Sequence, residues 1–263
     1  MRRPACLAVA ALVLVPASVG AGTGTHARSA GPPLALTATP AHVSLVGSGS
    51  ATIRVTNTGS SPVGVDAGRA GFALDLRGRP MVVRRADNRT AVSWVTVRPA
   101  RLLLPVGASR SLTVSARLPA RVEPGDHDAL VLLTTSPRRN AGVVVRMRIG
   151  VVVVVRAPGR VVRRLVLDSL AVRRARGARI LELWVANRGN VTETLSRGRV
   201  RISLRRGGSS TSLTAEAREL RPRTTGVVQL AYRGRLRGWV TARVEVRSER
   251  GRPVVARMFR LRL

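Results

Sequence analysis

Lysine does not occur in this sequence, and all 46 of its basic residues are arginines. This absence excludes a lysine Schiff base, the lysine of a phosphate-binding loop and a Ser–Lys dyad, since each of them needs an amine. Cysteine is almost absent as well, because Cys6 is the single example and lies near the start of the chain. If Cys6 leaves with a leader peptide, the mature chain has no disulfide and no thiolate metal site.

Aromatic residues make up only 2% of the chain, whereas apolar residues make up 44%. A hydrophobic core must therefore be built mainly from valine, leucine, alanine and isoleucine, and the branched Cβ of valine favours strands over helices. No segment beyond the start of the chain combines a sustained helical period with helix caps. The composition predicts an all-β protein, and 263 residues provide room for two cores of roughly 100 residues each.

Acidic residues are scarce too, because 13 Asp and Glu stand against 46 arginines, for a formal net charge of +33. A GC-rich genome would raise Arg, Ala, Gly, Val and Pro together, whereas selection for an anionic partner would raise arginine in particular, and the sequence leaves both explanations open. In either case this charge attracts polyanions such as wall glycopolymers, lipid headgroups and nucleic acid. Specific recognition of nucleic acid is not expected, because single-strand binders need exposed aromatic residues for base stacking.

Residues 1–21 have the form of a secretory signal peptide. Arg2-Arg3 supplies the positive start and residues 7–15 are apolar. Val19-Gly20-Ala21 is the expected cleavage site, with Thr25-His26-Ala27 as the alternative. We therefore expect an exported protein that is extracellular or associated with the cell wall. Whether the leader is removed or retained as an anchor is left open, as is the oligomeric state.

A five-residue phrase occurs twice, as Val55-Thr56-Asn57-Thr58-Gly59 and as Val185-Ala186-Asn187-Arg188-Gly189. Each copy ends a run of alternating apolar residues and enters an Asn-x-Gly bend, since Asn and Gly both tolerate positive φ angles. Two copies about one domain length apart predict two immunoglobulin-like β-sandwiches in tandem. The expected boundaries are a flexible segment at 22–33, a first sandwich at 34–156 and a second sandwich at 157–263.

The alternation of apolar and polar residues places the strands. In the first sandwich the expected strands are 36–45, 51–56, 63–67, 72–76, 92–97, 111–118, 129–134 and 143–155. In the second sandwich they are 161–167, 179–186, 200–204, 226–232, 240–246 and 254–263.

The first predicted sandwich carries an ordered set of short motifs: Ser93-Trp94-Val95, Pro99, Leu102-Leu103-Leu104-Pro105, Pro119 and Glu123-Pro124-Gly125-Asp126-His127-Asp128-Ala129. In this order they resemble the N-terminal domain of WxL-interacting cell-surface proteins and, more broadly, the immunoglobulin-like group that includes pilus-chaperone domains. The resemblance implies an exported two-domain protein that contacts peptidoglycan and surface partners.

The chain departs from that family in two respects. It shows no C-terminal membrane helix with a basic tail, since the longest apolar run after the leader, residues 149–155, is far shorter than the ~20 residues that span a bilayer. It also has His127 at a position where such domains often have tyrosine. We therefore expect no membrane span after the leader.

Groups suited to catalysis or metal binding are few. The histidines are His26, His42 and His127, and no Gly-x-Ser-x-Gly elbow or catalytic pair of carboxylates accompanies them. The polar segment 123–128 lacks the ligand spacing of a calcium loop, so a turn that leads into a strand explains it better. We expect a protein that is not an enzyme and has neither cofactor nor metal.

The tryptophans Trp94, Trp184 and Trp239 lie in strand-like patterns beside valine and leucine. This setting favours positions in the core over stacking on sugars, although wall-binding domains use exposed tryptophan for the latter.

Arginine alternates with apolar residues in several predicted strands, which places a guanidinium row outside and an apolar row inside. Such a row is either a solvated sheet face that discourages edge-to-edge aggregation or a surface that binds polyanions. The arginines expected to form such a surface are Arg146, Arg148, Arg199, Arg201, Arg205, Arg257, Arg260 and Arg262.

Two functions follow from these patterns. The first is a non-enzymatic envelope protein that binds peptidoglycan, an anionic wall polymer or a surface protein partner. The alternative is a chaperone-like protein in which the alternating run 143–155 completes the sheet of a secreted subunit by β-augmentation. The alternative predicts that charged residues at Met147 and Ile149 abolish binding, and a strand fully paired within its own sandwich would exclude it.

Overall fold

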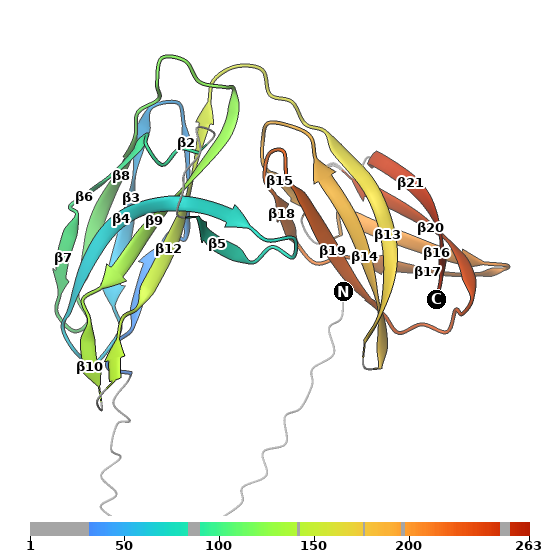
Figure 1. Ribbon diagram of the computed structural model, residues 1–263, viewed down its shortest axis with the longest axis horizontal. Helices are drawn as coiled ribbons and strands as arrows, with labels where there is room; N and C mark the ends of the chain where they lie inside the picture. The colour runs from blue at the N-terminus through green and yellow to red at the C-terminus, as the bar shows by residue number, and fades with distance from the viewer. Residues whose placement is uncertain (1–31, 84–89, 141–142, 176, 196–197, 248–252) are drawn as a thin grey trace, which may run out of the picture. The chain divides into compact units, whose positions relative to one another are not determined.

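The computed structural model describes residues 32–83, 90–140, 143–175, 177–195, 198–247 and 253–263 (Figure 1). Within these ranges the regular elements are all β-strands and no helix occurs, so the predicted all-β class is confirmed. The predicted leader and most of the segment 22–33 lie outside the described residues. No helix of the described residues is long and apolar enough to cross a membrane.

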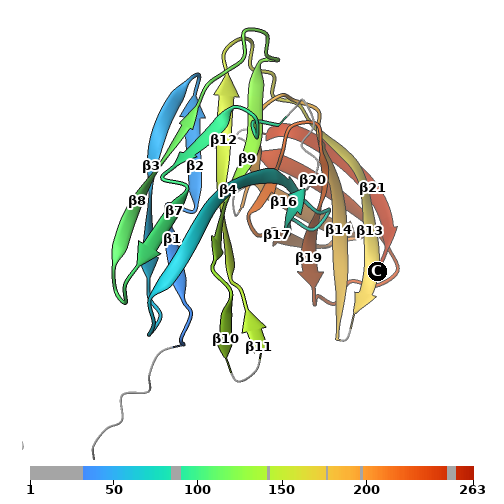
Figure 2. The ribbon, with the colours of Figure 1, turned by 60° about the vertical axis from the view of Figure 1, so that its left-hand side comes forward.

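The first sandwich contains β1 to β12 in two main sheets. One sheet has the order β1 (Leu36–Thr39), β3 (Gly49–Asn57), β8 (Ser109–Ala116) and β6 (Val95–Arg98). The other has the order β2 (His42–Val46), β12 (Arg148–Ala157), β9 (Gly125–Thr135), β4 (Val63–Leu74) and β5 (Pro80–Val83), with β7 (Arg101–Leu104) beside β4. The short strands β10 (Arg138–Asn140) and β11 (Val143–Val145) form a hairpin that extends beyond this sheet (Figure 2).

The second sandwich contains β13 to β21. Its sheets have the orders β13 (Leu165–Ala175), β14 (Ala178–Asn187), β19 (Thr225–Tyr232) and β17 (Ser209–Thr214), β16 (Val200–Arg206), β20 (Trp239–Arg247), β21 (Pro253–Arg262). A small pair is formed by β15 (Glu193–Leu195) and β18 (Arg218–Leu220). Residues 31–263 form one compact unit, so contacts between the two sandwiches belong to the fold.

Each sandwich has its own hydrophobic core, because inward positions recur at every second residue of a strand. In the first, Ile53, Leu112 and Leu133 are fully buried. In the second, Leu183 and Ile202 are fully buried and lie in facing sheets. As expected from the low aromatic content, both cores consist mainly of aliphatic side chains.

The repeated Asn-x-Gly phrase forms the same buried corner in both sandwiches. The Asn57 amide donates to the carbonyls of Ser61, Leu104 and Pro105 at 2.8–3.1 Å, and its oxygen accepts the N–H of Gly59. In the second sandwich, the amide of Asn187 donates to carbonyls at 2.8 and 3.0 Å, and its oxygen accepts the N–H of the glycine two residues on. One side chain therefore satisfies several backbone groups that would otherwise be buried without partners.

Several predicted strand boundaries were wrong. The predicted strand 36–45 is two strands in different sheets, because β1 pairs with β3 and β2 pairs with β12, and Pro40 between them has no N–H for a ladder. The predicted strands 63–67 and 72–76 are one strand, β4, since the residues between them pair with β9. The run 143–155 is divided into β11 and β12, because Met147 exchanges hydrogen bonds with the backbone and hydroxyl of Thr135.

The predicted strand 161–167 begins later, at Leu165, and continues to Ala175. Residues 162–164 instead bond to the loop after β14: the N–H of Val162 donates to the Asn190 Oδ1 at 2.7 Å, and the N–H of Arg188 donates to the Arg164 carbonyl. The strands β5, β7, β10, β15, β17 and β18 were not predicted, because each is too short for a clear alternation or carries mostly polar residues.

Candidate functional site

The most informative local feature is the unequal pairing of β12. On one side β12 pairs with β9 along its whole length, from Arg148 to Ala157. On the other side β2 pairs with residues 152–156 only. Among the described residues, no strand pairs with residues 148–151 on that second side, so this stretch is a free sheet edge.

The free edge exposes unpaired backbone groups. The N–H of Val152 donates to the Ala41 carbonyl at 3.0 Å, on the side of β2. Because backbone groups of successive residues point to alternate sides of a strand, the N–H and C=O groups of Gly150 and Arg148 face the same side as those of Val152, ahead of the first residue of β2. These groups form a template on which a further strand can pair.

An apolar row accompanies the free edge. Val151 is fully buried, while Met147 and Ile149 are half-buried against the core of the first sandwich. Val145 in β11 is 41% exposed. Along the chain from Val145 to Val151 the apolar side chains therefore become more buried, and the half-buried Met147 and Ile149 lie at the start of the free edge.

A second group of charged residues lies where the two sandwiches meet. Asp126 in β9 forms an ion pair with Arg156 in β12, with its Oδ1 2.6 Å from the arginine Nε. The other oxygen of Asp126 accepts the backbone N–H of Thr192, in the second sandwich, at 2.8 Å. Burial alone would raise the pKa of Asp126, but the hydrogen bonds from Arg156 and Thr192 outweigh it and hold the pKa below its usual value.

Arg221 reaches into the same joint from the second sandwich. Its side chain is almost fully buried, forms an ion pair with Asp128 in β9, and has its Nη1 3.5 Å from the carboxylate of Glu219. The guanidinium carbon lies 4.6 Å from the centre of the Phe72 ring, which is a cation–π contact. Burial lowers the pKa of Arg221 to about 9. The lower pKa reflects the cost of removing a charged guanidinium from water. Because this pKa is still above 7, Arg221 remains charged at pH 7.

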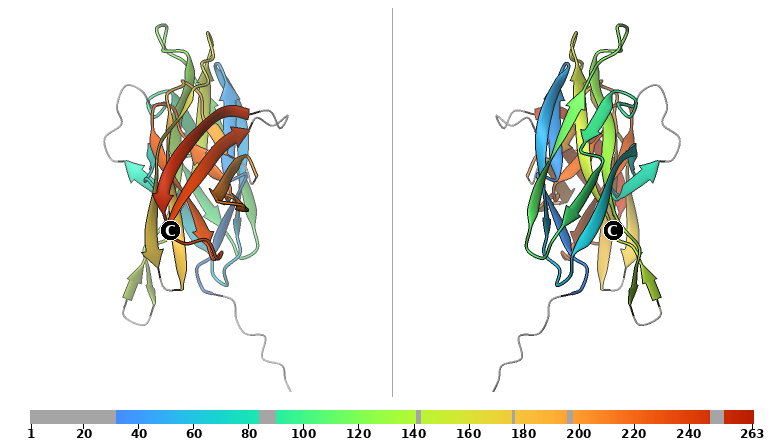
Figure 3. Two further views of the ribbon diagram at one scale, coloured as in Figure 1. Left: turned by 90° about the vertical axis from the view of Figure 1, so that its right-hand side faces the viewer. Right: turned by 90° about the vertical axis from the view of Figure 1, so that its left-hand side faces the viewer.

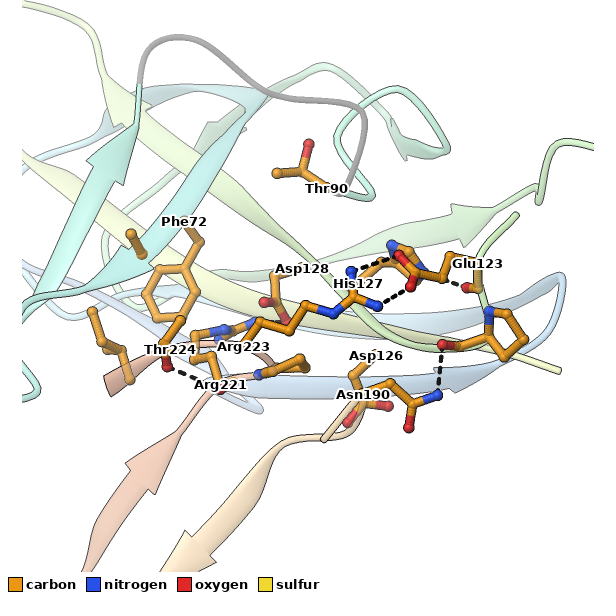
Figure 4. A pocket seen from close by; sticks show the side chains of 14 residues that line it. Phe72, Thr90, Glu123, Asp126, His127, Asp128, Asn190, Arg221, Arg223 and Thr224 are labelled. Carbon is orange, nitrogen blue, oxygen red and sulfur yellow. Dashed lines mark hydrogen bonds and ion pairs between the residues drawn. The ribbon is translucent and has the colours of Figure 1, made fainter. Parts of the chain in front are cut away.

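Arg221, Asp128 and Phe72 line a cavity of about 260 Å³ (Figure 4). At its rim the Nη1 of Arg223 lies 2.9 Å from an oxygen of Glu123. The ring of His127 contacts the carbonyl oxygen of Glu123 through Nε2 at 2.7 Å and lies 4.5 Å from the ring of Trp94. The charged groups of this cavity are thus engaged with one another across the joint.

The polar segment 123–128 is therefore more than the turn predicted from the sequence. Asp126, His127 and Asp128 lie in β9, and both carboxylates hold arginines of the joint. In the described part of the chain, no group of three or more His, Cys, Asp and Glu side chains is placed to hold a metal ion.

The sequence predicted core positions for all three tryptophans, and the structure does not place all of them in the core. Trp94 and Trp184 are half-buried, and Trp94 lies in the turn before β6 rather than within a strand. Trp239 is 56% exposed, so its predicted core position is wrong. It opens β20 on the outward face opposite Arg262, and the guanidinium of Arg260 lies 5.0 Å from its ring centre.

The arginines predicted to form one surface lie in separate places. Arg201, Arg205, Arg260 and Arg262 are exposed on the outer face of the sheet that contains β16, β20 and β21, which faces the viewer on the left of Figure 3. Arg146 and Arg148 are exposed near the free edge in the first sandwich. Two are engaged elsewhere, because Arg199 donates to the carbonyls of Thr194 and Arg247, and Arg257 donates to those of Leu167 and Asp168.

No protein-family model matches the sequence, and no curated protein matches it either. The resemblance to WxL-interacting proteins thus has no family match to support it. Solved structures do match. A chain of the chaperone–tip adhesin complex of CFA/I fimbriae biogenesis has a TM-score of 0.50 at 12% identity, over 86% of this chain and 98% of that chain.

Two further structures are similar at lower TM-scores. The class 5 fimbrial chaperone CfaA has a TM-score of 0.48 at 12% identity, over 86% of this chain and 99% of that chain. The CsuC–CsuE chaperone–subunit complex of Acinetobacter baumannii gives 0.46 at 12% identity, over 86% and 98%. At 12% identity the likeness to the first of these structures concerns the fold alone, an all-β chain of two immunoglobulin-like sandwiches.

Proposed function

We propose that this protein is an exported, non-enzymatic, chaperone-like protein that holds an extended segment of a surface protein along the free edge of β12. The observation that carries the proposal is the stretch 148–151, which pairs with β9 on one side and with no strand of the described residues on the other, so that the backbone groups of Arg148 and Gly150 are directed away from β9. The sequence alone favoured binding of a wall polymer or a surface protein partner, and the pairing of β12 supports the chaperone-like alternative better.

An added strand would be held in two ways. The backbone groups of Arg148 and Gly150 would pair with it, and each such hydrogen bond contributes about 0.5–1.5 kcal/mol. Apolar side chains of the partner would cover the exposed flank of Met147 and Ile149, because alternate residues of an added strand face the same side of the sheet. The backbone contacts give affinity for many sequences, and the apolar row selects among them.

The fold supports the same class of partner. The structure with the TM-score of 0.50 belongs to a complex described as one of a chaperone with a tip adhesin. By analogy we propose an exported surface subunit as the partner of this chain, an idea that rests on a likeness of fold and on the geometry of β12.

The experiment compares partners recovered from the exporting cell by the tagged full chain and by two variants. Met147→Arg places a charge beside the free edge, and Met258→Arg makes the same change at a methionine that is 62% exposed in β21. We expect an exported subunit to be recovered with wild type and Met258→Arg and to be lost with Met147→Arg. In the purified complex, the amides of Arg148 and Gly150 are expected to gain protection from hydrogen exchange. Equal recovery by all three proteins, or unprotected amides in the complex, would exclude the proposal.

A second candidate function is binding of peptidoglycan or an anionic wall polymer, favoured by the exposed arginines around Trp239 on the outer face of the second sandwich. A pull-down on purified cell wall tests it at ~0.15 M salt, where the screening length is ~8 Å. We expect enrichment over a control protein of equal net charge, and a loss of that enrichment in Trp239→Ala. Recovery no greater than that of the control protein would exclude it.

A further inference from the structure

A cluster of arginines lies at one end of the sheet formed by β13, β14 and β19. Figure 1 shows the three strands of this sheet. In the register of this sheet, Val172, Leu181 and Leu230 form one row of the core face. Two residues further along, the row consists of Arg174, Arg179 and Tyr232. Two arginines thus occupy neighbouring positions on the inward side of the sheet, where the preceding rows are apolar.

The pairing of Arg174 with Arg179 is unfavourable by itself. Residues directly opposite in antiparallel strands have Cβ atoms about 4.5–5.5 Å apart, and like charges there destabilise the pair. Elsewhere in this sandwich arginines have acidic neighbours: Arg173 is 3.0 Å from Glu182, and Glu245 lies between Arg243 and Arg247. Among the described residues, neither Arg174 nor Arg179 forms an ion pair or a hydrogen bond with an acidic side chain.

The chain after β19 adds two further arginines and completes a cavity. Arg233 and Arg237 join Arg174 and Arg179 around a volume of about 420 Å³, and no carboxylate is among the described residues that line it. Arg237 is held in place by hydrogen bonds from its Nη1 to the carbonyls of Gly234 and Leu236 at 2.8 and 3.0 Å.

The wall of this cavity is built by close packing. The buried Tyr232 ring forms one side, and its hydroxyl accepts the N–H of Leu236 at 2.7 Å. Gly234 packs so closely on this ring that a Cβ there would lie 2.6 Å from ring atoms. The loop that carries Arg233 and Arg237 therefore packs against the ring, and both arginines line the cavity together with Arg174 and Arg179.

We propose that this arginine pocket, formed by Arg174, Arg179, Arg233 and Arg237, binds a phosphate-type oxyanion. Guanidinium groups bind phosphate oxygens in a bidentate geometry, and several of them around one cavity suit a multiply charged anion. A bound anion would also relieve the repulsion between Arg174 and Arg179. The inference is independent of strand donation at β12, because the pocket lies wholly within the second sandwich.

Isothermal titration of the full chain with inorganic pyrophosphate at ~0.15 M salt tests the proposal. The variant Arg174→Gln/Arg179→Gln removes the opposed pair, and Arg201→Gln/Arg205→Gln removes the same charge from the outer face. We expect one saturable site in wild type, an affinity weakened roughly tenfold or more in the pocket variant, and a change below about twofold in the outer-face variant. Equal weakening in both variants would assign the binding to net charge alone and overturn the proposal, as would the absence of saturation in wild type.

Melting temperatures measured in phosphate-free buffer show whether the pocket variant is folded, so that a loss of binding is not mistaken for a loss of structure. Removing two opposed like charges is expected to leave the melting temperature of the pocket variant unchanged or raise it, whereas pyrophosphate is expected to raise that of wild type only. A third arm distinguishes a free anion from a lipid headgroup with the same chemistry. Binding to phosphatidylglycerol vesicles that pyrophosphate displaces would identify a headgroup as the source, and binding of pyrophosphate without vesicle binding would identify a soluble phosphate compound. A stabilising effect of pyrophosphate on the pocket variant as large as on wild type would refute the pocket.

Discussion

The carboxylate of Asp126 joins the two sandwiches, because it binds Arg156 within the first and accepts the backbone N–H of Thr192 in the second at 2.8 Å. Both contacts favour the charged form, so the pKa of Asp126 lies below its unfolded value. The stabilisation they provide is complete above the unfolded pKa, near 3.9, and is lost as the pH falls through the lower folded pKa.

The substitution Asp126→Asn tests this joint. At pH 7 we expect it to lower the free energy of unfolding by about 1.5–3 kcal/mol, since it removes hydrogen bonds to a charged group. Urea denaturation at pH 7 and at about pH 3 measures the effect, and the difference between variant and wild type is expected to shrink at the lower pH. A difference that is equal at both pH values would show that the charge of Asp126 contributes nothing.

Arg221 and Asp128 form the second contact of the joint, and they are expected to be strongly coupled. Arg221→Met leaves the Asp128 carboxylate without its cation in a mostly buried setting, which costs about 3–5 kcal/mol, whereas Arg221→Met/Asp128→Leu removes both charges and is expected to recover most of that loss. A double-mutant cycle by chemical denaturation measures the coupling. If the two single losses simply add, the pair makes no direct contribution.

The sequence predicted the parts of this fold that depend on local pattern. Alternation identified the strands that carry Ile53, Leu183 and Ile202, and the repeated Asn-x-Gly phrase identified the two corners. It could not predict that β2 begins only beside Val152, because the neighbours of a strand are set by residues distant in the chain. For the same reason the free edge of β12 was visible only as an apolar run.

The ion pairs between the two sandwiches could not be predicted from the sequence for a related reason. Asp128 and Arg221 are far apart in the sequence, and nothing local distinguishes this arginine from the others. The pairing of Arg174 with Arg179 did leave a signal, because a glycine at position 177 between two short polar-apolar runs is typical of a tight hairpin. Recognising that hairpin would have placed the two arginines opposite each other.

The tryptophans provide a contrast between a structural and an exposed aromatic side chain. Trp94 packs against the core of the first sandwich and lies 4.5 Å from the His127 ring, whereas Trp239 is 56% exposed. We expect Trp94→Ala to lower the free energy of unfolding by about 2 kcal/mol, roughly half the effect at a fully buried tryptophan, and Trp239→Ala to change it by less than about 0.5 kcal/mol. Thermal and urea denaturation of both variants measure this, and equal losses would contradict the assignment.

We expect Asn57 and Asn187 to contribute about equally to the free energy of unfolding, because they have equivalent surroundings. Each is almost fully buried, donates to carbonyls of distant loops and accepts a glycine N–H. Asn57→Ala or Asn187→Ala leaves these backbone groups buried without partners, so we expect each to lower the free energy of unfolding by about 1–3 kcal/mol. Thr58→Ala is the control, since it changes an exposed side chain in the same bend. Because the two corners share no residues, the losses in the double variant are expected to add within about 0.5 kcal/mol, and a deviation beyond that would mean that the two corners are coupled through the joint.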